Sequence, residues 1–129
     1  AGDNIAASKE RVGGVYKLVA IEKEEKILPK IKVSNDNIKT TTPDYKKVYR
    51  FYDKKTGYAL GDVITKQEEV IPTDEYTLIH PTETWKKTTI HNYIVRPLQI
   101  PIFLNGELVY KNKSLLEKQK YCQKEYDSL

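Results

Sequence analysis

Few side chains in this sequence could perform catalysis, and they are scattered along it. There are two histidines, His80 and His91, and one cysteine, Cys122. Neither histidine has a Cys, Asp or Glu at a spacing that metal sites use, so we expect no metal site. Cys122 could pair with a histidine as nucleophile and base. It falls, however, on the apolar face of an expected helix, where a thiol behaves as a small hydrophobe. The sequence therefore predicts no catalytic residue.

A second candidate for chemistry is the turn formed by Gly2, Asp3 and Asn4. Backbone N–H groups in tight glycine-containing turns bind phosphate, so these residues could be the end of an anion-binding loop. An ordinary loop explains them as well, and the local sequence does not choose between the two. Aspartates elsewhere lie in expected turns, and turn formation accounts for Asp44 and Asp53 without a catalytic role.

The run KKVYR, residues 46–50, mixes cations with an aromatic ring, as proteins that bind single-stranded nucleic acid do. An exposed strand face explains the run equally well. The whole chain has 22 basic and 18 acidic residues, a net charge of +4, with the two signs interleaved. Interleaved charge is typical of a solvated surface, whereas nucleic-acid modules usually carry a stripe of one sign. We therefore expect no nucleic-acid partner.

Composition places the chain among globular proteins. Of its 129 residues, 39% are hydrophobic and 31% charged, which suits one compact domain or part of a larger one. No run approaches the roughly 18 apolar residues of a membrane helix, and no secretory signal is present. One cysteine cannot form an intramolecular disulfide, so we expect a cytoplasmic protein without a membrane partner. The chain has no methionine and begins with Ala1, which suggests that it was cut from something longer or trimmed.

The pattern of apolar residues predicts an α+β fold, mainly antiparallel or mixed β-sheet with hairpins and one C-terminal helix. Residues 15–22 carry apolar side chains on both faces, which predicts a covered strand. Residues 23–47 are mostly a long connection, with a short edge strand expected around Ile31–Val33. A hairpin follows, in which residues 53–57 join strands at Val48–Tyr52 and Tyr58–Ile64.

Gly61 in the second of these strands predicts a bulge or a close backbone contact. Further strands are expected at Tyr76–His80 and Thr88–Val95. Within residues 97–110, Asn105–Gly106 predicts a type I′ hairpin, and Pro97 and Pro101 place its first strand at an edge.

The chain closes with a predicted helix. Ser114 and Glu117 have the spacing of a capping box, so we expect a helix from Leu115 to about Asp127. Roughly one face of this helix carries four residues, namely Leu115, Cys122, Tyr126 and Leu129.

Four segments, in this order, resemble the C-terminal region of nicotinate phosphoribosyltransferases. They are GDNIAASKERVGGVYKLVAIE (2–22), KTTTPDYKKVYRFYDKKTGYALGDVI (39–64), LIHPTETWKKTTI running into RPLQIPIFLNGELVY (78–110), and SLLEKQKYCQKEYDSL (114–129). Together they cover about four-fifths of the chain. One departure is that Pro43 is followed by Asp44 where the family has a glycine.

The resemblance implies that residues 1–129 form a single C-terminal domain of a larger phosphoribosyltransferase. Such enzymes convert nicotinate and phosphoribosyl pyrophosphate to nicotinate mononucleotide in NAD salvage. They use Mg²⁺ and couple the reaction to ATP through a phosphorylated histidine. Residues 1–13 would be the trailing edge of the barrel phosphate loop, with Gly2, Asp3 and Asn4 matching its last turn. His80 and His91 do not match the phosphorylated histidine.

The resemblance thus implies a fragment that is inactive alone, needs no cofactor of its own, and has the remainder of the parent chain as its partner. The apolar faces of residues 15–21 predict self-association into a homo-oligomer when the fragment is isolated. The alternative is an independent β-rich binding or oligomerisation module that uses the Tyr-rich hairpin around Val48–Tyr58.

Overall fold

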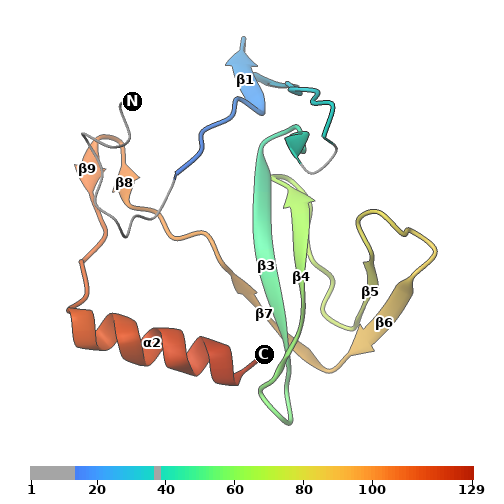
Figure 1. Ribbon diagram of the computed structural model, residues 1–129, viewed down its shortest axis with the longest axis vertical. Helices are drawn as coiled ribbons and strands as arrows, with labels where there is room; N and C mark the ends of the chain where they lie inside the picture. Colours follow the sequence, from blue (N-terminus) through green and yellow to red (C-terminus); the bar gives the residue numbers. More distant parts are fainter. Residues whose placement is uncertain (1–13, 37–38) are drawn as a thin grey trace. The chain divides into compact units, whose positions relative to one another are not determined.

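The structure, a computed structural model, describes residues 14–36 and 39–129, and contacts divide the chain into two compact units, 1–45 and 46–129. Its strands all pair antiparallel and one described helix closes the chain, which confirms the expected α+β class (Figure 1). Within the described ranges no helix is long and apolar enough to cross a membrane. The elements are β1 (Ala20–Lys23), β2 (Lys26–Pro29), β3 (Lys46–Asp53), β4 (Ala59–Lys66), β5 (Glu75–Ile79), β6 (Lys87–His91), β7 (Tyr93–Pro97), β8 (Phe103–Leu104), β9 (Glu107–Leu108) and α2 (Leu115–Asp127).

The first unit contains a short hairpin, β1–β2, that the sequence analysis did not predict. Its turn residues Glu24 and Glu25 have φ of 51° and 60°, the left-handed pair that a type I′ turn needs. Glutamate is not a usual residue there, so the turn carried no sequence signal. The prediction of one covered strand over residues 15–22 is wrong. The strand begins only at Ala20, and Val15 and Tyr16 are 80% and 99% exposed.

The edge strand expected at Ile31–Val33 is also absent from the described part of this unit. Lys32 instead donates its backbone N–H to the Oγ1 of Thr41 at 2.9 Å, and the Thr41 N–H returns to the Lys32 carbonyl at 3.4 Å. Because the Lys32 N–H bonds to a side-chain hydroxyl and not to a backbone carbonyl, the two segments do not continue as a β-ladder.

The second unit is built on a three-stranded sheet in the order β4–β3–β7. The predicted β3–β4 hairpin is confirmed, and its turn ends at Gly57 with φ 75°. Gly61 fulfils both expectations placed on it. The β3–β4 register shifts beside it, and a Cβ there would lie 3.0 Å from a methyl of Leu78.

The run expected as one strand, Thr88–Val95, is two strands. Asn92 has φ 52°, and this left-handed residue turns the chain from β6, which pairs with β5, into β7, which pairs with β3. Asparagine tolerates this conformation better than other non-glycine residues. The single apolar run therefore serves two sheets.

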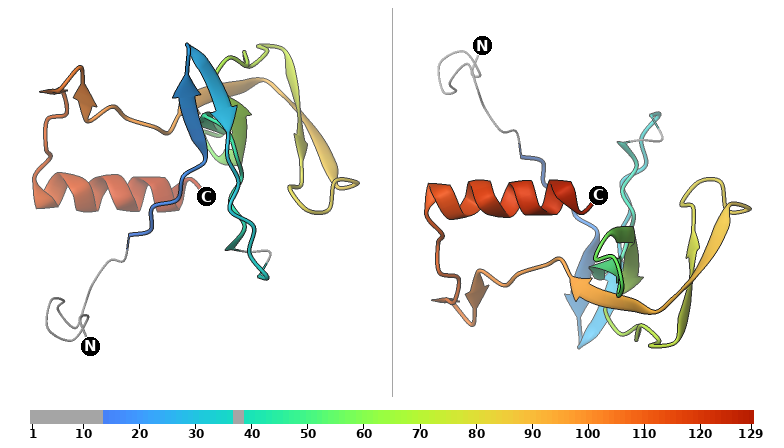
Figure 2. Two further views of the ribbon diagram at one scale, coloured as in Figure 1. Left: turned by 90° about the horizontal axis from the view of Figure 1, so that it is seen from above. Right: turned by 90° about the horizontal axis from the view of Figure 1, so that it is seen from below.

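One face of the β4–β3–β7 sheet, here called the inner face, packs on the β5–β6 hairpin and forms the core. Phe51 is fully buried, with its ring centroid 4.9 Å from that of Tyr93 and 5.0 Å from that of Tyr76. Ile90 and Tyr93 complete the buried hydrophobic residues of the described chain. The helix α2 approaches the other face, here called the outer face (Figures 1 and 2).

The predicted C-terminal turn and helix are confirmed, whereas Pro97 ends β7 and Pro101 precedes β8, so neither proline lies in the first strand of this hairpin. Asn105 and Gly106 have φ of 50° and 83° between β8 and β9, as a type I′ turn requires. At α2 the Ser114 side chain accepts from the Glu117 N–H, while the Glu117 carboxylate accepts from the Ser114 N–H at 2.8 Å. This capping box satisfies two N-terminal donors of the helix.

A backbone constraint at Asp44 gives a first prediction. Asp44 has φ 90°, a conformation that favours glycine. Its N–H donates to the Val19 carbonyl at 2.8 Å, as does that of Lys30. Asp44→Gly should relieve about 1 kcal/mol of strain. That makes native-state exchange of the Lys30 amide about fivefold slower. Asp36→Gly is the matched control, because φ is not positive there, and it should not slow exchange of the Lys30 amide. If exchange in Asp44→Gly equals that of the wild type, Asp44 is not strained.

Candidate functional site

Three charged residues face each other across the outer face of the sheet. In the strand register Arg50 of β3 lies directly opposite Asp62 of β4 on one side and Arg96 of β7 on the other. Arg50 and Asp62 form a bidentate pair, with Nε and NH2 each 2.7 Å from a carboxylate oxygen. That leaves Arg96 beside a like charge, an arrangement that destabilises neighbouring strands unless an anion intervenes.

The missing anion comes from the last turn of α2. Glu125 accepts from NH1 of Arg96 at 2.9 Å and from NH2 of the same guanidinium. Its Oε2 also lies 3.6 Å from NH1 of Arg50 and accepts from the Tyr52 hydroxyl at 3.2 Å. The Glu125 side chain is 16% exposed, so these contacts are partly shielded from water. We call these five residues, Arg50, Tyr52, Asp62, Arg96 and Glu125, the polar clamp.

The clamp shifts the ionisation of its members in the directions expected for mutual pairing. The hydrogen bond from Arg96 lowers the pKa of Glu125, and that from Arg50 lowers the pKa of Asp62. The same bonds raise the pKa of both guanidinium groups. Burial is the main cause that raises the pKa of Tyr52. Around neutral pH every acidic and basic member therefore holds the charge that its partner needs.

The clamp also holds α2 in place. No residue of the helix is buried. Besides the Glu125 contacts, one backbone hydrogen bond joins the end of the helix to the sheet, from the Ala59 N–H to the Ser128 carbonyl at 2.7 Å. The apolar face expected on this helix is exposed in the described chain. Leu115, Tyr126 and Leu129 are 73–74% exposed, and Cys122 is exposed as well. Arg50 and Arg96 attract the Glu125 carboxylate, so the helix turns this polar residue, and not its apolar face, toward the sheet.

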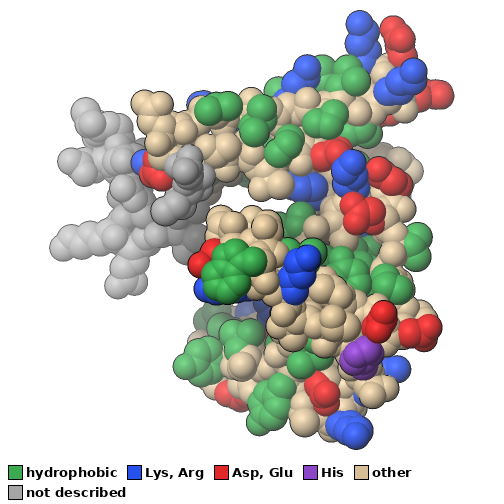
Figure 3. All heavy atoms as spheres, turned by 90° about the vertical axis from the view of Figure 1, so that its right-hand side faces the viewer, with side chains coloured by type: hydrophobic (Ala, Val, Ile, Leu, Met, Phe, Trp, Pro, Cys, Tyr) green, Lys and Arg blue, Asp and Glu red, His purple; other side chains and the backbone are tan. Residues whose placement is uncertain are grey.

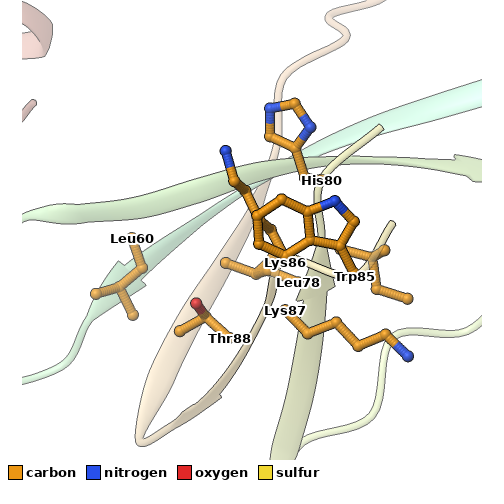
Figure 4. A pocket seen from close by; sticks show the side chains of 8 residues that line it. Leu60, Leu78, His80, Trp85, Lys86, Lys87 and Thr88 are labelled. Atoms are coloured by element: carbon orange, nitrogen blue, oxygen red, sulfur yellow. The ribbon is translucent and has the colours of Figure 1, made fainter. Parts of the chain in front are cut away.

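An open hollow of about 590 Å³ lies where the loop between β5 and β6 approaches β4. Figure 4 shows the Trp85 indole beside His80 and Lys86, with Leu60 across the hollow. Trp85 is 74% exposed, and Lys86 lies 5.0 Å above its ring. Over this side of the molecule, charges of both signs are mixed with apolar side chains (Figure 3). The hollow offers an aromatic anchor and apolar contacts.

A second hollow, of about 430 Å³, lies between β7, the β3–β4 turn and the last turn of α2. Three clamp residues line it, together with Asp53, Lys54, Gly57, Ile94, Val95, Pro97, Lys124 and Ser128. The lining of this hollow is both charged and apolar. All of its lining residues belong to the second unit.

The candidate residues of the sequence analysis either have structural roles or lie outside the described residues. Gly2, Asp3 and Asn4 lie outside the described residues, so their phosphate-binding role stays a prediction. The Nδ1 of His80 accepts from the Glu83 N–H at 3.0 Å and closes a loop, whereas His91 lies across from Glu75 on the adjacent strand. In residues 14–36 and 39–129 no group of three His, Cys, Asp or Glu residues could hold a metal ion.

The KKVYR run is engaged within its own unit. Arg50 pairs with Asp62, and Tyr49 packs against the core. The clamp itself was missed by sequence reasoning, because Glu125 lies 29 residues beyond Arg96 and 75 beyond Arg50. Arg50 and Asp62 do lie on the two strands of the predicted hairpin, but only the observed register, which shifts between Phe51 and Tyr52, places them opposite each other.

Known proteins resemble the chain over most of its length. A family model described as the nicotinate phosphoribosyltransferase C-terminal domain matches residues 45–129. The chain is 34% identical over 119 residues to the nicotinate phosphoribosyltransferase of Bacillus subtilis, covering 92% of this chain and 24% of that protein. It is 32% identical over 112 residues to that of Caenorhabditis elegans, covering 85% and 19%. The chain thus spans about a quarter or less of the relatives it matches.

The clamp predicts a specific loss of stability. Glu125→Gln removes the charge that separates Arg50 from Arg96 and should cost about 1.5–3 kcal/mol in the free energy of unfolding. The loss should depend on pH. Because the folded-state pKa of Glu125 is lowered, its contribution is complete above the unfolded pKa of about 4.3 and disappears as pH falls through the folded value.

Urea unfolding of both proteins between pH 7 and pH 2.5 measures this effect. The gap between wild type and Glu125→Gln should be widest at neutral pH and close in acid. Glu68→Gln, an exposed residue, is the control and should match the wild type throughout. A gap that stays constant over the whole range would show that Glu125 acts through shape alone.

Proposed function

Since the chain belongs to the nicotinate phosphoribosyltransferase family, as its C-terminal domain, we propose that it is the architectural part of an enzyme whose reaction lies elsewhere in the polypeptide. The parent transfers the phosphoribosyl group of phosphoribosyl pyrophosphate to nicotinate, with ATP hydrolysis, in the salvage of NAD. The observation that carries this proposal is the family match across residues 45–129, which takes in the whole second unit.

The chemistry of the described residues supports an architectural role. Stabilising a phosphoribosyl transition state needs convergent donors, cations and a metal. The cations of the clamp are occupied by carboxylates, and the described ranges contain no carboxylate cluster for Mg²⁺. We therefore assign Mg²⁺ and ATP to the remainder of the parent. Gly2, Asp3 and Asn4 are proposed to end the phosphate loop of that remainder, with residues 1–13 as its trailing edge.

The distribution of apolar side chains supports a large contact with that remainder. Only three hydrophobic residues of the described chain are buried, Phe51, Ile90 and Tyr93. Exposed large apolar groups occur in both units. In the second unit, Trp85 projects from a loop that the hydrogen bond to His80 holds in shape. Exposed tryptophans on fixed loops are typical anchors of protein interfaces. We propose that the Trp85 hollow contacts the parent body in a cytoplasmic enzyme.

The alternative of an independent module that uses the Tyr-rich hairpin has less support. Tyr52 is held by Glu125 and Tyr49 packs on the core, so their rings are not free to stack on a ligand. Tyr58, which is 57% exposed, remains available in the turn.

The proposal is tested by assaying nicotinate mononucleotide formation from nicotinate, phosphoribosyl pyrophosphate, ATP and Mg²⁺. The 129-residue chain should form none, because residues 14–36 and 39–129 hold no carboxylate cluster for Mg²⁺, whereas the full-length parent should form it. Product from the isolated chain would overturn the architectural role. A full-length parent without this activity would overturn the assigned reaction.

Self-association of the isolated chain is a further expected outcome. Val15 and Leu18 are 80% and 62% exposed. Burial of such groups is worth about 25 cal/mol per Å², so copies should pair through them. Light scattering should show a mass that rises with concentration, less so in a Val15→Ser/Leu18→Ser variant. Val70→Ser, which removes an apolar side chain that is 89% exposed in the other unit, is the matched control. A strictly monomeric chain across a wide concentration range would contradict this expectation.

A further inference from the structure

The hollow beside the clamp has the dimensions and walls of a small-molecule site. Its volume of about 430 Å³ falls within the range of ligand pockets. Three separate segments of the second unit enclose it, so a ligand there would touch β7, the β3–β4 turn and the last turn of α2. The floor is apolar, since Ile94 is 54% exposed on an edge strand, opposite Tyr52 in the register.

Both carboxylates that line the hollow are already satisfied. Asp53 uses one oxygen to accept from the backbone of Lys55 and Thr56 at 2.8 and 2.7 Å and from the Thr56 hydroxyl at 3.1 Å. These bonds lower the pKa of Asp53. Glu125 accepts from Arg96 and Tyr52. These hydrogen bonds fix the two carboxylates in place but do not cancel their charge, so both count as anions of the hollow.

The cations of the hollow are only partly satisfied. Lys54 and Lys124 line it, and neither has an ion-pair partner among residues 14–36 and 39–129. Arg96 adds a guanidinium that is 36% exposed, with donors beyond the edge that binds Glu125. The last-turn carbonyl of Glu125 is capped by the N–H and hydroxyl of Ser128, which reduces its repulsion of an anion. The hollow is thus lined by three cations, Lys54, Arg96 and Lys124, against the carboxylates of Asp53 and Glu125, which leaves one positive charge in excess over an apolar floor.

We propose that this hollow binds a small organic anion, one carboxylate or phosphate on a flat apolar body. The anionic group would lie between Lys54 and Lys124, within reach of the outer N–H groups of Arg96. The apolar body would cover Ile94 and Pro97. The assignment is independent of the parent's reaction, because it rests on the second unit's own walls and charges.

Binding is tested by ¹H–¹⁵N NMR titration of the 129-residue chain with phenyl phosphate and benzoate, which separate the two anion types. Benzyl alcohol and inorganic phosphate each supply one half of the proposed ligand. One or both aromatic anions should shift the amides of Gly57, Ile94 and Ser128 in a saturable way. Each half alone should bind at least about tenfold more weakly, since charge and apolar contact act together.

A Lys54→Gln/Lys124→Gln variant should weaken the aromatic anion about tenfold while its spectrum stays dispersed. Lys55→Gln/Lys118→Gln loses the same charge from residues that do not line the hollow and should bind as the wild type does. Equal weakening in both variants would reduce the effect to overall surface charge and overturn the site. Absence of saturable shifts at the three amides, or inorganic phosphate binding as tightly as phenyl phosphate, would also overturn it.

Discussion

Two arginines that face each other across neighbouring strands set the arrangement of the second unit. Arg50 and Arg96 are register partners, and like charges at such positions push strands apart. Asp62 neutralises Arg50 from the far side but leaves Arg96 without a carboxylate. The sheet supplies no other acid at this level, so the anion must come from above it. Glu125 meets that requirement and thereby fixes where α2 ends.

The same constraint explains why a helix with no buried residue is held at all. Its inward contact is a carboxylate, so its orientation depends on hydrogen bonds rather than on apolar burial. Hydrogen bonds to charged groups are directional and stronger than neutral ones, which lets a few contacts define a geometry. The capping box at Ser114 stabilises the helix from its other end, where nothing in the described second unit buries it. The apolar stripe of α2 is consequently left exposed for another surface.

Local patterns in the sequence predict local structure well. The capping box, the Asn105–Gly106 turn and the β3–β4 hairpin each depend on residues a few positions apart, and each is found as expected. The misses share another cause. The turn at Glu24–Glu25 uses residues that do not favour it, and the break at Asn92 depends on β7 finding β3 some 40 residues earlier in the chain. Hydrophobic periodicity does not record which strand a segment pairs with.

The candidate site shows the same limit. A pattern search looks for clusters of His, Cys and acids, but here the groups that converge are two arginines and two carboxylates from four separate elements. Their proximity follows from the register of β3 with β4 and β7. Register is set partly by the inner-face residues Phe51 and Tyr93, whose rings meet in the core. The aromatic core therefore aligns the charges on the opposite face, because a slip of one residue would turn Arg50 inward and Phe51 outward. One strand register thus fixes both the aromatic core on the inner face and the polar clamp on the outer face, so a shift in register would disrupt both.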